Sequence, residues 1–319
     1  MAAIAVETGA RGGSAPQVRS AVSVIDTKTN RLAVRAIEVG PYPSAIAITP
    51  DGSRAYVVNA SLQGNGSVSV IDTATNRVIV KAIEIGRYPE QIAITPDGSR
   101  AYAVNLGSNS ISEIDTTTNS VTAQAIRVGR QPIAIAIAPD GSRVYLTNGR
   151  DGTVSVIDTA TGAPAAKAIK VGRNPSAIAV APDGGRVYVA NTGDDTVSVI
   201  DATTSKVIRR IGTGDTPAAI AISPSGNRAY VANARDDTLS VIRTATNKVT
   251  GAIKVPHRPT AVAISPNGAR AYVTSLEPGL VSVINTATGR PAAKAIGVGP
   301  LPLGLAITPD GRRVYVVKN

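Results

Sequence analysis

The chain has 319 residues, with 33 Lys and Arg against 22 Asp and Glu, no Cys, Phe or Trp, and one His. This composition excludes a thiolate nucleophile, an iron–sulfur cluster, a disulfide framework and the usual multi-histidine zinc site. The apolar content of 43% predicts a folded chain, and no apolar run is long enough to span a bilayer.

The first segments along the chain predict a tail followed by two strands. Residues 1–20, MAAIAVETGARGGSAPQVRS, lack both the basic start and the long apolar stretch of a secretory signal, so we expect an N-terminal tail. Residues 22–26 and 32–39 alternate apolar and polar side chains, which is typical of β-strands. Neither strand has a partner before it in the sequence.

Residues 44–85 contain a unit that the rest of the chain repeats. Strands are predicted at residues 44–49, 54–59, 68–72 and 78–85, with a Pro-Asp-Gly turn after the first. Similar turns recur at intervals of 42 to 46 residues, beginning at Pro50, Pro96, Pro139, Pro182, Pro224, Pro266 and Pro309. A period of this length, filled with four short strands, is typical of a β-propeller.

The end of the chain predicts how the ring closes. Residues 303–308 and 313–318 are a first and a second strand with no partners after them. We therefore expect an all-β fold, a single seven-bladed propeller of four-stranded antiparallel blades over residues 21–319. Its seventh blade combines two N-terminal and two C-terminal strands.

Two repeated positions have structural interpretations. A tyrosine in each second strand is predicted to pack between neighbouring blades. Arginines that begin second strands should pair with aspartates that end third strands, as in Arg54 with Asp72, whereas Arg228 faces Arg243.

Repeats such as AIAITPDGSRAYVVN followed by SVSVIDTATNRV resemble the YVTN family of β-propeller repeats, over about residues 21 to 319. The resemblance implies a seven-bladed propeller, often exported or at a cell surface, that acts as a binding or adhesive scaffold. Related seven-bladed propellers include lactonases, so a lactonase-like hydrolase is the alternative.

Chain direction divides the predicted loops between two faces. The turns from first to second and from third to fourth strands form one face, called the turn face here. The connections between blades and those from second to third strands form the other, called the loop face. We predict that the loop face binds a protein or carbohydrate partner, through the candidates Tyr42, Tyr88, Arg87, Arg130, Arg173 and Arg258.

A few acidic residues and the one histidine are candidates for metal binding or catalysis. Asp194, Asp195, Asp236 and Asp237 are weak candidates for Ca²⁺, because six or more oxygens must converge on that ion. Catalysis would rest on Glu90 at the channel mouth and on His257, since few other titratable groups are placed for acid–base work. The sequence favours a role without catalysis, metal or cofactor.

The distribution of charge bears on the remaining alternative, binding to nucleic acid or another anionic polymer. By our count the turn face carries 15 basic and 10 acidic residues, the outer strands 9 and 2, and the loop face 7 and 8. A diffuse cationic rim predicts weak, salt-sensitive and non-specific binding of such polymers. For the compartment, the family resemblance favours an extracytoplasmic or cell-surface location.

Overall fold

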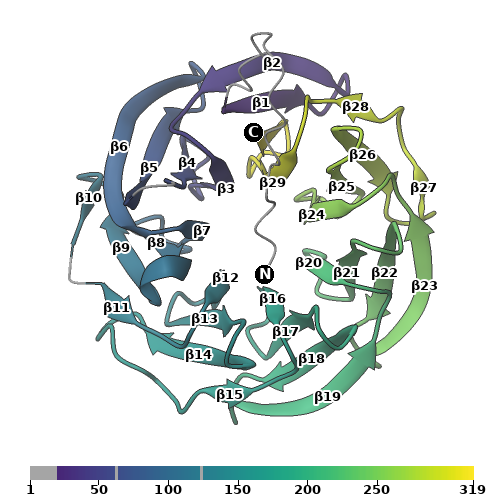
Figure 1. Cartoon of the computed structure of the whole chain (residues 1–319). Coiled ribbons are helices and arrows are strands. Elements are labelled where there is room, and N and C mark those ends of the chain that lie inside the picture. The colour runs from purple at the N-terminus through teal and green to yellow at the C-terminus, as the bar shows by residue number, and fades with distance from the viewer. Residues whose placement is uncertain (1–19, 62–63, 123–124) are drawn as a thin grey trace, which may run out of the picture.

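The computed structural model describes residues 20–61, 64–122 and 125–319. It contains seven antiparallel sheets arranged as blades around a central axis (Figure 1). The fold class is therefore the predicted one. The predicted tail, residues 1–20, lies outside the described residues except for Ser20.

We number the blades from the first complete one, and give their strands from the axis outwards. Blade 1 consists of β3 (Pro43–Ile48), β4 (Arg54–Asn59), β5 (Asn65–Asp72) and β6 (Arg77–Arg87). Blade 2 consists of β7 (Pro89–Ile94), β8 (Arg100–Asn105), β9 (Ser110–Asp115) and the short β10 (Ser120–Val121) and β11 (Ile126–Arg127). Blade 3 consists of β12 (Pro132–Ile137), β13 (Arg143–Asn148), β14 (Thr153–Asp158) and β15 (Ile169–Lys170).

The remaining blades follow the same order. Blade 4 consists of β16 (Pro175–Val180), β17 (Arg186–Asn191), β18 (Thr196–Asp201) and β19 (Lys206–Gly212). Blade 5 consists of β20 (Pro217–Ile222), β21 (Arg228–Asn233), β22 (Thr238–Arg243) and β23 (Lys248–Lys254). Blade 6 consists of β24 (Pro259–Ile264), β25 (Arg270–Ser275), β26 (Leu280–Asn285), β27 (Arg290–Pro291) and β28 (Ile296–Gly297). Blade 7 consists of β29 (Pro302–Ile307), β30 (Arg313–Lys318), β1 (Ala21–Asp26) and β2 (Arg31–Glu38).

Blade 7 closes the ring as predicted. Its strand order is β29, β30, β1 and β2, so the two ends of the chain share one sheet (Figure 1). β1 and β30 pair antiparallel over their whole length, with Ala21 opposite Lys318 and Asp26 opposite Arg313. The only helix among the described residues is the 3₁₀ turn η1 (Leu106–Ser108), and none there is long and apolar enough to cross a membrane.

The outermost strands are less regular than the inner ones. Two prolines in the outermost segments coincide with interruptions: Pro164 forms only an isolated bridge to Ile157, and β27 ends at Pro291. Proline has no N–H to donate to a ladder, so it is tolerated only where one side of the strand is unpaired.

The core lies between blades. The tyrosine of each second strand is at most 2% exposed, which confirms its predicted place. Tyr145 of blade 3, for example, belongs to one apolar cluster with Val187 and Val189 of blade 4. Each buried valine contributes about 1.5 to 3 kcal/mol relative to an exposed one, so every blade is stabilised by its neighbours.

The arginines that begin second strands join adjacent blades. Arg54 lies opposite Asp72, which confirms the predicted register, but the predicted ion pair is wrong. Arg54 Nη1 donates to the carbonyl of Thr116 in blade 2 at 2.7 Å, while Asp72 Oδ1 accepts from the N–H and hydroxyl of Thr75. We call the donors the interblade arginines. Their bonds run from Arg54 to Thr116, Arg100 to Thr159, Arg143 to Ala202, Arg186 to Thr244, Arg228 to Thr286, Arg270 to Thr27 and Arg313 to Thr73.

These seven bonds form a closed circuit, because each reaches the following blade and the last returns to blade 1. Arg228 faces Arg243 as predicted, and it is not without a partner, because it donates to the carbonyl of Thr286 at 2.7 Å. The sequence could not show whether these arginines and aspartates form ion pairs. Cross-strand register places their Cα atoms opposite each other without fixing where the side chains point.

Candidate functional site

The loop face is built on a residue with positive φ before the proline that begins each first strand. A left-handed conformation is uncommon for residues other than glycine and costs about 1 to 3 kcal/mol. Its recurrence in all seven blades shows that it belongs to the fold. The residues, with φ between 45° and 59°, are Tyr42, Tyr88, Gln131, Asn174, Thr216, Arg258 and Leu301.

Backbone hydrogen bonds hold these residues in place. The carbonyl of Tyr42 accepts from Ala60 N–H at 3.1 Å, and the carbonyl of Tyr88 accepts from Leu106 N–H at 3.0 Å. The N–H of Tyr42 donates to Ser20 Oγ at 3.1 Å. The side chains of Tyr42 and Tyr88 are therefore attached to a backbone that hydrogen bonds hold in place.

Tyr42 and Tyr88 lie at equivalent positions of adjacent blades. Their side chains are 46% and 39% exposed, and they are the only exposed tyrosines among the described residues. Leu301 occupies the same position in blade 7, whereas blades 3 to 6 carry polar residues there. The structure thus brings the two predicted tyrosines into one sector of the loop face, which we call the tyrosine pair.

Glu90 follows Pro89 in the first strand of blade 2, close to the axis. Hydroxyls at the equivalent position of three blades bridge to the next blade: Ser44 donates to the carbonyl of Pro89 at 3.2 Å, and Ser176 and Thr260 make the same contact with Pro217 and Pro302. Glu90 makes no such bridge, and its side chain is exposed. The surrounding blades nevertheless displace bulk water, and this desolvation raises the pKa of the Glu90 carboxyl.

His257 is placed away from Glu90. Its Nδ1 lies 2.9 Å from Asp237 Oδ2, and this side-chain hydrogen bond lowers the pKa of Asp237. His257 precedes the first strand of blade 6, and Glu90 lies in blade 2, with two blades between them along the shorter path around the ring. The two candidates for catalysis are therefore not brought together.

Three of the four candidate loop arginines pair with nearby carboxylates. Arg130 Nε lies 2.6 Å from Asp151 Oδ1, Arg173 pairs with Asp194, and Arg258 lies 3.5 Å from Glu277. Arg87 donates its backbone N–H to Ser108 Oγ at 2.9 Å. These arginines belong to different loops, and only Arg87 neighbours the tyrosine pair in sequence.

The paired aspartates hold the loops of the loop face. Asp194 Oδ2 accepts from Arg173 N–H at 2.7 Å within blade 4, and Asp195 Oδ1 accepts from Thr216 N–H at 2.9 Å, at the entry to blade 5. Asp236 and Asp237 repeat the arrangement for blades 5 and 6. Across the described part of the chain, no three His, Cys, Asp or Glu side chains gather as a metal site would require.

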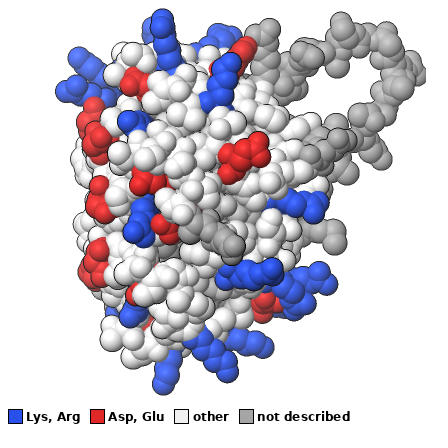
Figure 2. All heavy atoms as spheres, turned by 90° about the vertical axis from the view of Figure 1, so that its left-hand side faces the viewer, with Lys and Arg blue, Asp and Glu red and all other residues white. Residues whose placement is uncertain are grey.

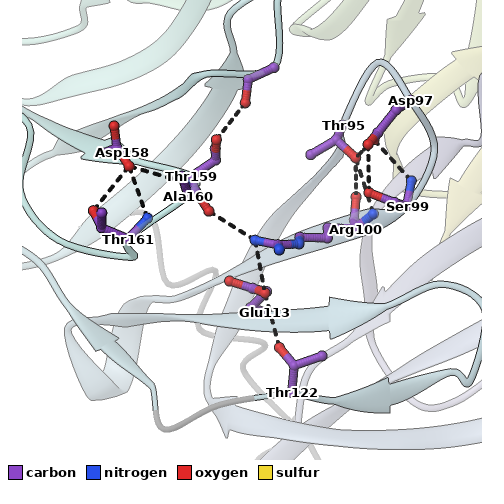
Figure 3. Close-up of polar contacts among 11 residues, drawn as sticks. Thr95, Asp97, Ser99, Arg100, Glu113, Thr122, Asp158, Thr159, Ala160 and Thr161 are labelled. Carbon is purple, nitrogen blue, oxygen red and sulfur yellow. Dashed lines mark hydrogen bonds and ion pairs between the residues drawn. The ribbon is translucent and has the colours of Figure 1, made fainter.

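Sequence reasoning missed a polar cluster between blades 2 and 3 (Figure 3). Glu113 Oε1 lies 3.4 Å from Arg100 Nη1 and accepts from Thr122 Oγ1–H at 3.0 Å, and the Glu113 side chain is 13% exposed. Arg100 also donates to the carbonyl of Thr159. A break in the repeat was the available signal, because the other third strands carry valine where Glu113 stands.

Residues 91–265, more than half of the chain, match the family model described as lactonase, 7-bladed beta-propeller. No curated protein matches the sequence.

Solved structures share the fold. Hydrazine synthase of Kuenenia stuttgartiensis is similar with a TM-score of 0.77 and 21% identity, over 90% of this chain and 98% of that one. A functionally unknown protein of Desulfotomaculum acetoxidans DSM 771 is similar with a TM-score of 0.75 and 19% identity, over 88% and 93% of the two chains.

Proposed function

The chain belongs to the lactonase family of seven-bladed β-propellers, and from this premise we propose that it is a binding module whose loop face takes a carbohydrate partner. The tyrosine pair carries the proposal. Two exposed aromatic rings at equivalent positions of adjacent blades offer apolar faces that sugar rings can stack on, each with a hydroxyl at its edge.

The surroundings of the tyrosine pair support this use. The backbones of Tyr42 and Tyr88 are hydrogen-bonded before any ligand arrives, so little conformational entropy is lost on binding. Arg87 and Glu90 flank Tyr88 in sequence and supply a donor and an acceptor for sugar hydroxyls. A few polar groups beside apolar rings are the usual composition of a small-ligand site.

Binding of neutral oligosaccharides tests the proposal. A glycan array followed by calorimetry with the best neutral oligosaccharide should give binding that Tyr42→Ala and Tyr88→Ala each weaken at least about tenfold, since aromatic anchors dominate interface energies. Ile208→Ala removes a side chain that is 50% exposed on β19 and serves as the matched control. Absence of glycan binding, or capture of a protein that needs both tyrosines, would show that the partner class is wrong.

Lactone hydrolysis is the second candidate, favoured by the family match and by the raised pKa of Glu90, which brings a carboxyl closer to the working range of a general acid. The position of His257 weighs against it. We expect no hydrolysis of simple lactones in a titrimetric assay. Activity that disappeared in Glu90→Gln, with folding retained, would replace the binding proposal with this one.

A further inference from the structure

The seven blades place equivalent residues on the turn face, and these residues differ between blades. In blades 1, 4 and 7 a row of three residues crosses the second, third and fourth strands, with a carboxylate in the middle. Blade 4, for example, has Arg186 opposite Asp201 and Asp201 opposite Lys206. The central aspartate lies between two cations in each of these rows.

Blades 5 and 6 lack that carboxylate. The row of blade 5 is Arg228, Arg243 and Lys248, three cations opposite one another on adjacent strands. In blade 6 the central residue is Asn285, between Arg270 and Arg290. Like charges on directly opposed residues destabilise a sheet, and an anion bound over the blade 5 row would offset that repulsion.

The first turns of the same two blades have also lost their aspartates. Ser225 and Asn267 stand where the other five repeats have Asp. The turn of blade 6 keeps its geometry, because Asn267 Oδ1 accepts from Ala269 N–H at 3.0 Å, as Asp140 Oδ1 accepts from Ser142 N–H at 3.0 Å. The blade 6 turn therefore keeps its side-chain acceptor without a negative charge.

Asn285 gives the same result at the end of the third strand. Its Oδ1 accepts from Ala287 N–H at 2.9 Å, as Asp158 Oδ1 accepts from Ala160 N–H at 3.0 Å. In blade 6, therefore, neither turn needs a negative charge at the position where most of the other repeats have Asp. The turn-face residues 223–228, 243–248, 265–270 and 285–290 contain five cations and no carboxylate.

A hollow of about 280 Å³ lies between blades 5 and 6 on this face. Arg228, Asn227, Asn267 and two serines contribute to its lining. The equivalent hollows between blades 1 and 2, 2 and 3, and 3 and 4 each contain an arginine and two aspartates. Figure 2 looks onto the edge of the blades at the left of Figure 1, where acidic side chains stand along one face among basic ones.

We propose that blades 5 and 6 form an anion-binding surface on the turn face for an acidic polysaccharide, with one sulfate or phosphate group seated in this hollow. Arg228 supplies the charge there, and the serine hydroxyls and asparagine amides suit sugar hydroxyls and oxyanion oxygens. The surface extends across the strand ends of the two blades through Arg243, Lys248, Arg270 and Arg290.

The absence of stacking groups favours a polysaccharide over single-stranded nucleic acid. Proteins that bind single strands stack the bases on exposed aromatic side chains. The chain has no Phe or Trp, and the only exposed tyrosines among the described residues lie on the loop face. The surface is on the opposite face from the tyrosine pair, so this inference is independent of the proposed function.

The test uses the whole chain and a sulfated hexasaccharide of the heparin type, measured by calorimetry at two salt concentrations. Arg243→Asp and Asn267→Asp each restore the residue type that other blades hold at these positions, so the fold accommodates them. We expect each variant to weaken binding about tenfold or more, because it adds a negative charge where the anionic ligand would bind. Arg77→Asp makes the same charge change as Arg243→Asp, and a larger one than Asn267→Asp, on the turn face of blade 1, yet it should alter affinity less than about twofold.

Further arms identify the source of the anion. Inorganic sulfate alone should compete weakly with the hexasaccharide, and the desulfated hexasaccharide should not bind. The proposal is overturned if no hexasaccharide binding is seen, if Arg77→Asp weakens it as much as Arg243→Asp and Asn267→Asp do, or if a single-stranded oligonucleotide binds more tightly through the same residues.

Discussion

At the scale of a residue, the interblade arginines add charged hydrogen bonds to the apolar contacts between neighbouring blades. Arg270 is the one whose bond, to the carbonyl of Thr27 at 2.7 Å, links blade 6 to the N-terminal half of blade 7. The donor is charged and the acceptor is a backbone oxygen far along the chain. Ring closure therefore depends on it more directly than on an exposed surface arginine.

We predict that Arg270→Gln lowers the free energy of unfolding by about 1 to 2 kcal/mol, the range of a partly buried hydrogen bond from a charged donor. Urea unfolding followed by circular dichroism measures it. The control Arg290→Gln removes the same charge from the exposed outer strand of the same blade and should change stability by less than about 0.5 kcal/mol. Equal losses in both variants would contradict the role given to Arg270.

Single residues also show where the sequence was insufficient. Tyr42 and Tyr88 stand outside the series of one tyrosine per second strand, and the structure places them at equivalent positions of adjacent blades. Glu113 breaks the repeat equally clearly, but only the structure shows that it contacts Arg100 and Thr122. The partner of Arg54 could not be predicted, because its acceptor, the carbonyl of Thr116, belongs to another blade and every residue has a carbonyl.

At the scale of an element, the first turns of six blades carry an Asp or Asn side chain that accepts a backbone N–H two residues further on. In blade 2, Asp97 accepts from the Thr95 hydroxyl and from the N–H and hydroxyl of Ser99. These bonds, the one from Thr95 foremost, lower the pKa of Asp97 from 3.8 to about 2. The folded state therefore favours the charged form.

The lowered pKa of Asp97 determines how the stability of the protein depends on pH. The contribution of Asp97 to stability is fully present above pH 3.8 and is lost as the pH falls towards about 2, because the folded protein then binds the proton less readily than the unfolded chain. We predict that Asp97→Asn reduces the fall in melting temperature between pH 4 and pH 2, measured by calorimetry. Arg87→Gln is the control and should leave the pH profile unchanged. Identical profiles for Asp97→Asn and the parent would disprove the assignment.

Element boundaries were predicted well where turns are fixed and less well elsewhere. The second strand of blade 1 is Arg54–Asn59, as expected from the Pro-Asp-Gly turn before it. Its first strand begins one residue earlier than predicted, at Pro43, which pairs with Asn59. The fourth strands lie at the edge of each blade and are paired on one side only, and so their ends were the hardest to infer.

At the scale of the molecule, stability rests on an uninterrupted ring. Deletion of residues 303–319 removes β29 and β30, and with them the only partner of β1 on its inner side. We predict aggregation or a large fall in melting temperature, because exposed strand edges pair with other chains. Light scattering and calorimetry measure both. A truncated protein that stayed monomeric and melted like the full chain would contradict closure by the shared blade.

The pairing of β1 with β30 also determines how the ring responds to tension. Ala21 at the start of β1 lies opposite Lys318 at the end of β30, so the two strand ends leave the sheet side by side. Pulling them apart loads the hydrogen bonds of an antiparallel ladder one pair after another rather than all together, since those bonds run perpendicular to the strands. Force applied between residues 21 and 318 would therefore unzip blade 7 first and open the circle at low load, while the six other blades are still intact.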